Sequence, residues 1–330
     1  MSFENAIDRS AVRAHFRRAA ATCGEDVLTR EVDRRMQERL DYVRLQPRCI
    51  LDLGCGPNPA CTGLAARYPQ AHCVGLDPIF AQGRAALASS GYPSPTSERG
   101  AIASESGTTD LPSPCHSREG GNPAPDKRAG GEGIQAPKPQ QDPRITTLAG
   151  DAEALPLREN CADLVWANLL LPWLVSTPAF LAEALRCLTP GGLLMFSALG
   201  PDTLKELRGG FRDGYAHTQT FPDLHDLGDL LLSSGFADPV VDMEIITLTY
   251  THLEGLIRDL RAAGATCAMQ GRRRGLVGRQ VLKNLHAHYE TLRREERLPA
   301  TFEILYGHAW KPEHAPSEHL PDGRAVIRFR

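Results

Sequence analysis

The stretch Cys49-Ile50-Leu51-Asp52-Leu53-Gly54-Cys55-Gly56-Pro57 decides the fold of this 330-residue chain. Five residues with mostly apolar side chains run directly into a turn that holds two glycines, a pattern typical of a buried strand followed by a tight turn. Glycine lets the backbone approach a ligand closely, and open α/β sheets bind their ligands where the strands end. We therefore expect a binding site at the end of this strand.

The segments around this stretch alternate between strand and helix patterns, which indicates a mostly parallel sheet with helices on both faces. Seven strands are expected: Cys49 to Leu53, His72 to Leu76, Ile145 to Leu148, Asp163 to Ala167, Leu193 to Ala198, Val240 to Tyr250 and Thr301 to His308. Apolar residues recur at helical spacing in Gly63 to Tyr68, Thr177 to Leu188, Asp223 to Ser234 and Leu253 to Ala263. Further helices are expected at Ala11 to Ala20, Val32 to Val43 and Val277 to Arg297, as lid or substrate-side elements.

Residues 92–142 differ in composition from the rest of the chain. These 51 residues hold eight prolines and seven glycines but only three Ile, Leu, Val or Phe. Such a segment cannot bury enough apolar surface to offset the entropy of ordering it, so we expect a disordered insertion. The prediction is one domain over residues 1–312, interrupted by this insertion and followed by a flexible tail at 313–330.

Composition also limits the possible functions. No apolar run long enough to cross a membrane and no secretory signal are found, which predicts a cytoplasmic protein. The nine cysteines form no C-x-x-C pair and no cluster with histidines, which argues against a metal site and against disulfides. The formal charge of −3 gives no reason to expect a nucleic acid or membrane partner, and a monomer is expected.

The second expected strand ends in Gly75-Leu76-Asp77, about twenty residues after the glycine turn. An acidic residue at that place can accept hydrogen bonds from both hydroxyls of a ribose. A dinucleotide-binding fold needs a third glycine where this chain has Pro59, so NAD is disfavoured. The pattern indicates an adenine nucleoside.

The run Leu51 to Gly56 resembles motif I of class I methyltransferases, although Asn58 stands where the third glycine of that motif is usual. Gly150 to Pro156, Asp163 to Asn168 and Leu188 to Leu194 resemble later motifs of the same class, in the same order. This resemblance implies a Rossmann-like fold and S-adenosylmethionine as the cofactor. The implied cofactor-binding residues are Asp52, Gly54, Cys55, Gly56, Asp77, Asp151, Ala152 and Asn168.

Outside the insertion, the chain is similar to one branch of that class, the malonyl-[acyl-carrier-protein] O-methyltransferases of biotin synthesis (BioC). The similarity lies in Asn168 to Trp173, Leu199 to Leu207, Leu260 to Thr266 and Tyr306 to Trp310. It implies methylation of the free carboxylate of a malonyl thioester on acyl carrier protein. Two alternatives stay open: a methyltransferase for another small acid or phenol, and an assembly factor or arginine hydroxylase that acts on a protein, because a complex I assembly factor shares the C-terminal pattern.

A carboxylate is ionised at neutral pH and needs no general base, so the implied mechanism is one of positioning and no catalytic residue is assigned. Asn168 and Trp173 are the candidates for the wall of the methyl pocket, whereas Trp166 is expected in the core. Between Arg258 and Arg297, ten Lys or Arg face four acids. Because acyl carrier proteins are acidic, Arg272, Arg273 and Arg274 are the predicted docking residues, with a solvated turn as the alternative.

Overall fold

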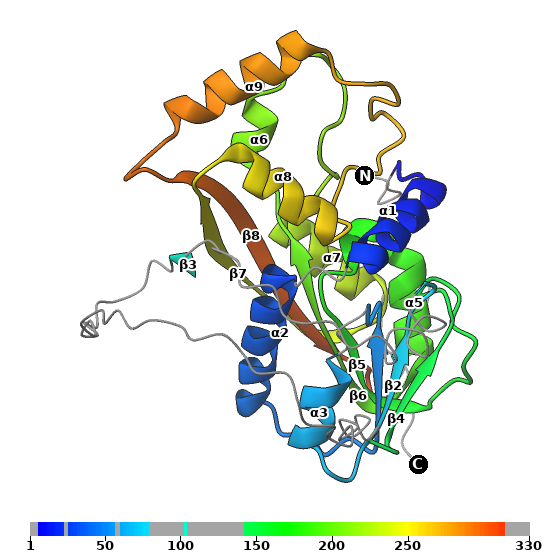
Figure 1. Cartoon of the computed structure of the whole chain (residues 1–330). Helices are drawn as coiled ribbons and strands as arrows, with labels where there is room; N and C mark the ends of the chain where they lie inside the picture. The colour runs from blue at the N-terminus through cyan, green and yellow to red at the C-terminus, as the bar shows by residue number, and fades with distance from the viewer. Residues whose placement is uncertain (1–5, 23–25, 57–59, 80–101, 104–141, 314–330) are drawn as a thin grey trace, which may run out of the picture.

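The computed structural model describes residues 6–22, 26–56, 60–79, 102–103 and 142–313, and its sheet has the strand order β3-β7-β8-β6-β5-β1-β2-β4 (Figure 1). The strands β4, β2, β1, β5 and β6 pair in parallel, while β8 runs antiparallel to β6 and to β7. The strands are β1 (Cys49–Leu53), β2 (His72–Leu76), β3 (Ile102–Ala103), β4 (Ile145–Leu148), β5 (Ala162–Ala167), β6 (Leu188–Leu199), β7 (Ala237–Tyr250) and β8 (Leu298–Trp310).

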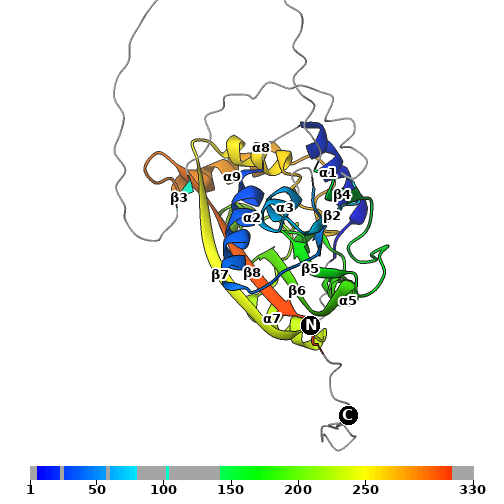
Figure 2. The ribbon, with the colours of Figure 1, turned by 90° about the horizontal axis from the view of Figure 1, so that it is seen from below.

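Helices cover both faces of this sheet, as the alternating sequence pattern predicts (Figure 2). Helices α2 (Val27–Arg39) and α3 (Cys61–Arg67) pack on one face, against Ile50 of β1 and Trp166 of β5. Helices α5 (Thr177–Cys187) and α7 (Leu224–Ser233) pack on the other, against Leu51 and Val165. Alternate residues of each buried strand thus enter two separate cores.

The remaining helices gather at the end of the sheet where the parallel strands finish (Figure 1). They are α1 (Arg9–Thr22), α6 (Lys205–Gly209), α8 (Leu253–Ala262) and α9 (Arg279–Thr291), and short 3₁₀ turns occur at Leu40–Tyr42 and Leu171–Trp173. Helix α1 packs against α8 although the two are far apart in the sequence. In the parts of the chain that are described, every helix is too short or too polar to cross a membrane.

The seven expected strands are all present, but several are longer than predicted: β7 begins three residues early, at Ala237, and β8 extends beyond the expected range at both ends. Strand β6 begins at Leu188, five residues before the expected start, because Leu188 pairs with Ala162 ahead of a bulge at the Pro-Gly-Gly turn. The five-residue α6 was not expected. Most of the segment 92–142, for which disorder was predicted, lies outside the described residues, but Ile102–Ala103 forms the two-residue β3 against β7. The predicted flexible tail also lies outside them, apart from Glu313.

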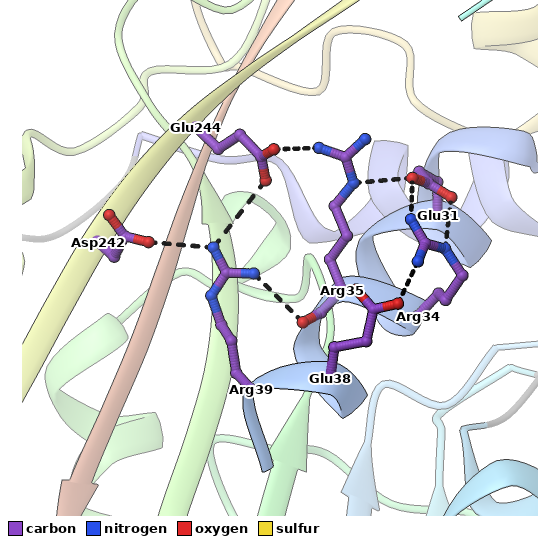
Figure 3. A network of polar contacts seen from close by, with 7 residues as sticks. All are labelled: Glu31, Arg34, Arg35, Glu38, Arg39, Asp242 and Glu244. Carbon is purple, nitrogen blue, oxygen red and sulfur yellow. Dashed lines mark hydrogen bonds and ion pairs between the residues drawn. The ribbon is translucent and has the colours of Figure 1, made fainter. Parts of the chain in front are cut away.

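A charged network fastens α2 to the edge of the sheet (Figure 3). Arg35 is nearly buried and pairs with Glu31 of its own helix, 2.8 Å away, and with Glu244 of β7. Arg39 reaches Asp242 of β7 at 3.0 Å, and its guanidinium lies 3.6 Å from the centre of the Tyr306 ring on β8. These contacts hold α2 beside the antiparallel strands, and the first residues of α2 line the same cavity as the end of β1.

We expect Arg35→Ala to lower the free energy of unfolding by roughly 1 to 3 kcal/mol, because the change removes the closer of the two arginines that pair with Glu244, together with a nearly buried side chain. Arg34→Ala is the matched control, since Arg34 is half-exposed and pairs only with Glu31 and Glu38 of the same helix. It should cost less than about 0.5 kcal/mol. Urea unfolding at equilibrium measures both, and equal losses would show that the bridge to β7 does not hold the helix.

Candidate functional site

The glycine turn after β1 is fixed to the neighbouring strand by backbone hydrogen bonds. The Gly54 amide donates to the Leu76 carbonyl at 2.8 Å, and the Cys55 amide donates to the same oxygen at 3.4 Å. Gly54 and Gly56 have φ values of +69° and +55°, which side chains disfavour. A Cβ on Gly54 would also meet Leu170 Cδ1 at 2.7 Å. Both glycines are therefore required by the backbone path.

Asp77, directly after β2, completes the turn. One carboxylate oxygen accepts from the Gly56 amide at 3.2 Å and the other accepts from the Ile79 amide at 2.7 Å. The side chain is nearly buried, yet it belongs to the lining of the main cavity. The ends of β1 and β2 are thus joined through one carboxylate at the place where an adenine nucleoside is expected.

A cavity of about 650 Å³ opens at this edge of the sheet, a volume within the range of sites for small molecules and cofactors. It extends from the glycine turn to an apolar region under α1, α8 and the segment after α6. Seven of the eight predicted cofactor residues line it: Gly54, Cys55, Gly56, Asp77, Asp151, Ala152 and Asn168. The apolar region is lined by side chains such as Phe16, Trp173, Leu204, Leu207, Leu248 and Phe302.

Asp52, the eighth predicted residue, lies outside this cavity. It lines a smaller one between α2 and α3, and its carboxylate accepts a hydrogen bond from the Cys61 amide at 3.3 Å, at the start of α3. Side chains alternate along a strand, so Asp52 points to the other face from Leu51 and Leu53. Burial, reinforced by the nearby Asp33, raises the pKa of Asp52 to about 7. The geometry gives Asp52 the task of holding α3.

Helix α1 closes the cavity through contacts that the sequence did not indicate. Arg9 pairs with Asp151 at 3.2 Å and with Glu153 at 2.6 Å, across 142 and 144 residues of chain. The ring of Phe16 stands edge-on to Trp173, with centroids 5.0 Å apart. Arg9 thus holds α1 against the segment that follows β4, and Phe16 holds it against the 3₁₀ turn that ends at Trp173. Pairs so distant in the sequence leave no local signal, which is why Arg9 and Phe16 were missed.

The two predicted pocket residues have different surroundings. Both ends of the Asn168 amide are hydrogen-bonded: Nδ2 donates to the Thr29 carbonyl at 2.9 Å, and Oδ1 accepts from Ser197 Oγ at 2.7 Å. Asn168 therefore ties the first turn of α2 to the sheet while it lines the cavity. Trp173 presents its ring to the cavity beside Phe16. Trp166 is fully buried and donates to Asp33 at 3.1 Å, as expected of a core residue.

The three arginines predicted for docking also have different surroundings. Arg272 pairs with Asp8 at 2.8 Å and donates to the Met269 carbonyl at 2.9 Å, so it holds the start of α1 to the chain. Arg273 is half-buried and lines the cavity. Arg274 is exposed. Their common sequence pattern does not give them a common environment.

The residues present fit S-adenosylmethionine. The positive-φ glycines leave the backbone of the turn uncovered for a ligand, and Asp77 lies at the same wall with acceptors for hydroxyl groups. Asp151 and Ala152, two further residues that the resemblance assigns to the cofactor, line the next part of the cavity. With this strand order, the site defines a class I S-adenosylmethionine-dependent methyltransferase.

Comparison with known proteins refines that class. A family model described as "Methyltransferase domain" matches residues 129–196. The malonyl-[acyl-carrier protein] O-methyltransferase of Laribacter hongkongensis is 42% identical, and the match covers 98% of this chain and 96% of that protein. The protein of the same name from Nitrosospira multiformis is 40% identical, over 99% and 97%. The chain therefore belongs to the malonyl-[acyl-carrier protein] O-methyltransferase family.

We expect Asp77→Ala to weaken the binding of S-adenosylmethionine by about 1 to 3 kcal/mol, because ribose hydrogen bonds and the bond to the Gly56 amide are lost together. Calorimetry on the folded variant measures the change. Asp229→Ala, at an exposed position of α7 away from the cavity lining, serves as the control and should bind normally. Unchanged affinity in Asp77→Ala would place the ribose elsewhere.

The raised pKa of Asp52 predicts a pH effect on stability. The folded protein holds this proton up to a pH of about 7, whereas the unfolded chain releases it near pH 4. The folded state thus binds more protons between these values, so Asp52 lowers stability as the pH rises through this window. In Asp52→Asn, unfolding by urea from pH 5 to 8 should show a smaller decline than in the parent. If the free energy of unfolding fell equally with pH in the two proteins, the raised pKa of Asp52 would be contradicted.

Proposed function

We propose that this protein transfers the methyl group of S-adenosylmethionine to the free carboxylate of a malonyl group carried on acyl carrier protein, an early step of biotin synthesis. The observation that carries the proposal is a single cavity that joins the glycine turn and Asp77 to an apolar region large enough for an acyl group. Relatives with this enzyme name, identical at 40% or more over nearly the whole chain, support it.

When bound, the cofactor supplies an electrophilic methyl group on a positively charged sulfur. The carboxylate oxygen forms the new bond to carbon while the carbon–sulfur bond breaks and its electron pair stays on sulfur. Opposite charges disappear in this step, so a dry cavity favours it over water. Apolar side chains such as Leu204 and Phe302 exclude water here, and α1 covers the opening. The protein's task is to position the reactants.

For the carrier protein, exposed cationic side chains near the cavity opening support docking at α1 and α8. Arg17 and Arg18 are exposed on α1, and Arg258 and Arg261 are exposed on α8, which packs against it. Arg274 is exposed close to the same opening, next to cavity-lining Arg273. Acidic surfaces are attracted to such groups during encounter. Arg272 already pairs with Asp8, so we assign it a structural role and not a docking role.

The proposal is tested by incubating the purified protein with S-adenosylmethionine and malonyl-acyl carrier protein. Formation of S-adenosylhomocysteine and of the methyl ester, detected by intact mass, is the expected result. Transfer to free small acids or phenols alone would favour a different methyltransferase. A protein arginine that gains oxygen while the cofactor keeps its methyl would favour the hydroxylase alternative.

The docking surface predicts an effect that depends on the carrier. Changing Arg17 and Arg18 to Ala should raise the KM for malonyl-acyl carrier protein roughly tenfold and flatten its salt dependence, because exposed charges act on encounter. The KM for a short malonyl thioester should not change. Arg44 and Arg158 are exposed just before β1 and β5, at the opposite edge of the sheet, so their double change to Ala is the control. If both double variants changed the KM for malonyl-acyl carrier protein equally, α1 would not be the docking surface.

A further inference from the structure

The segment after α6 brings an aromatic ring, an acid and an imidazole to one wall of the cavity. The rings of Phe211 and His217 are stacked, with centroids 3.4 Å apart and planes 5° from parallel. His217 Nε2 lies 2.7 Å from Asp213 Oδ1. Phe211 and His217 both line the cavity, and the side chains of His217 and Asp213 are only 13% and 15% exposed. The Phe211 ring thus holds one face of the imidazole, and Asp213 holds its Nε2 atom.

Arg273 reaches the same acid from the other side. Its Nη1 lies 3.8 Å from Asp213 Oδ2, a buried oxygen that has no hydrogen-bond partner among the described residues. Arg273 Nε donates to the Leu276 carbonyl at 3.0 Å, and its guanidinium lies 5.5 Å from the centre of the Tyr215 ring. Two side chains that can carry positive charge therefore share one carboxylate.

The hydrogen bond from His217 keeps the pKa of Asp213 below its usual range, so Asp213 is an ionised acceptor and Nε2 carries the proton. Nδ1 is then the ring nitrogen left to face a ligand. The guanidinium has more donors than its contacts with Leu276 and Asp213 use. The guanidinium supplies positive charge beside the sheltered imidazole, which suits an anion.

Other cationic side chains of the cavity suit this task less well. Among the described residues, those that line it are Arg9, Arg13, His217, Arg261 and Arg273. Arg9 already pairs with Asp151 and Glu153. Arg13 and Arg261 are exposed on the outer helices, where water screens their charge. His217 and Arg273 remain as the sheltered pair.

Resting on the proposed function, we propose that His217 and Arg273, positioned by Asp213, bind the free carboxylate of the malonyl group. One edge of the carboxylate contacts the Arg273 guanidinium and the His217 imidazole, and the remaining oxygen lone pairs are available for attack. The methyl ester product is neutral and loses this attraction, which favours its release. An acyl group without a terminal carboxylate gains nothing from the pair, so the same residues select malonyl over acetyl chains.

The test compares a malonyl pantetheine thioester with its methyl ester, because the two differ in charge at the methylated oxygen and neither needs the carrier protein. Arg273→Gln and His217→Gln should each raise the Kd of the malonyl compound roughly tenfold, measured by calorimetry in the presence of S-adenosylhomocysteine. The Kd of the ester should stay within about twofold, and cofactor binding, which reports folding, should be unchanged. Arg212→Gln, at an exposed position of the same segment, is the matched control and should bind both compounds normally.

Equal weakening of acid and ester would overturn the inference, since it would show a change of pocket shape rather than a lost charge. Unchanged binding of the acid in both variants would overturn it as well. Asp213→Asn should act like a weaker His217→Gln, raising KM for the acid more than it lowers kcat, because Asp213 positions the ring without touching substrate. The Kd values from calorimetry do not depend on turnover. A parent enzyme that binds the malonyl compound selectively but transfers no methyl group would refute the proposed function alone.

Discussion

The structure depends on the fastening of the glycine turn to the end of β2. The Gly54 amide is held by the Leu76 carbonyl, and the Gly56 amide is held by the Asp77 carboxylate. Both bonds require β1 and β2 to be parallel neighbours in register, Leu53 beside Leu76. They also require residues that accept positive φ at both glycines. Once these conditions are met, the backbone of the turn faces the cavity, and every other wall is arranged around it.

Those other walls come from parts of the chain that are distant in sequence, and ion pairs and hydrogen bonds join them alongside ring contacts such as that of Phe16 with Trp173. Arg9 connects α1 to the segment after β4, and Asp8 connects the same end of α1 to Arg272. Asn168 ties the first turn of α2 to the end of β5. Apolar side chains line the interior of the cavity, whereas these ion pairs and hydrogen bonds lie at its rim. This division keeps the reacting region dry while fixing the lid.

Much of the sheet could be predicted from the sequence, because buried parallel strands read as short apolar runs between turn residues. The borders of β1, β2 and β4 agree with the prediction at both ends. Strand β6 was predicted too short, since its first residues pair before a bulge that no periodicity reveals. Five residues are too few for α6 to show a helical pattern. In the site, a motif could identify the glycine turn, but it could not show that Asp52 faces α3 or that Arg272 meets Asp8, which is 264 residues away.

The pairing of Asp8 with Arg272 has a consequence for the order in which the molecule is completed. Helix α1 is synthesised well before its partners at residues 266–272. During translation, the glycine turn and the contacts of α1 with residues 151–173 can form while this second set of partners for α1 is still missing. The enclosed cavity is therefore a late product of synthesis, and a chain that stopped before these residues would carry the cofactor motif without its cover.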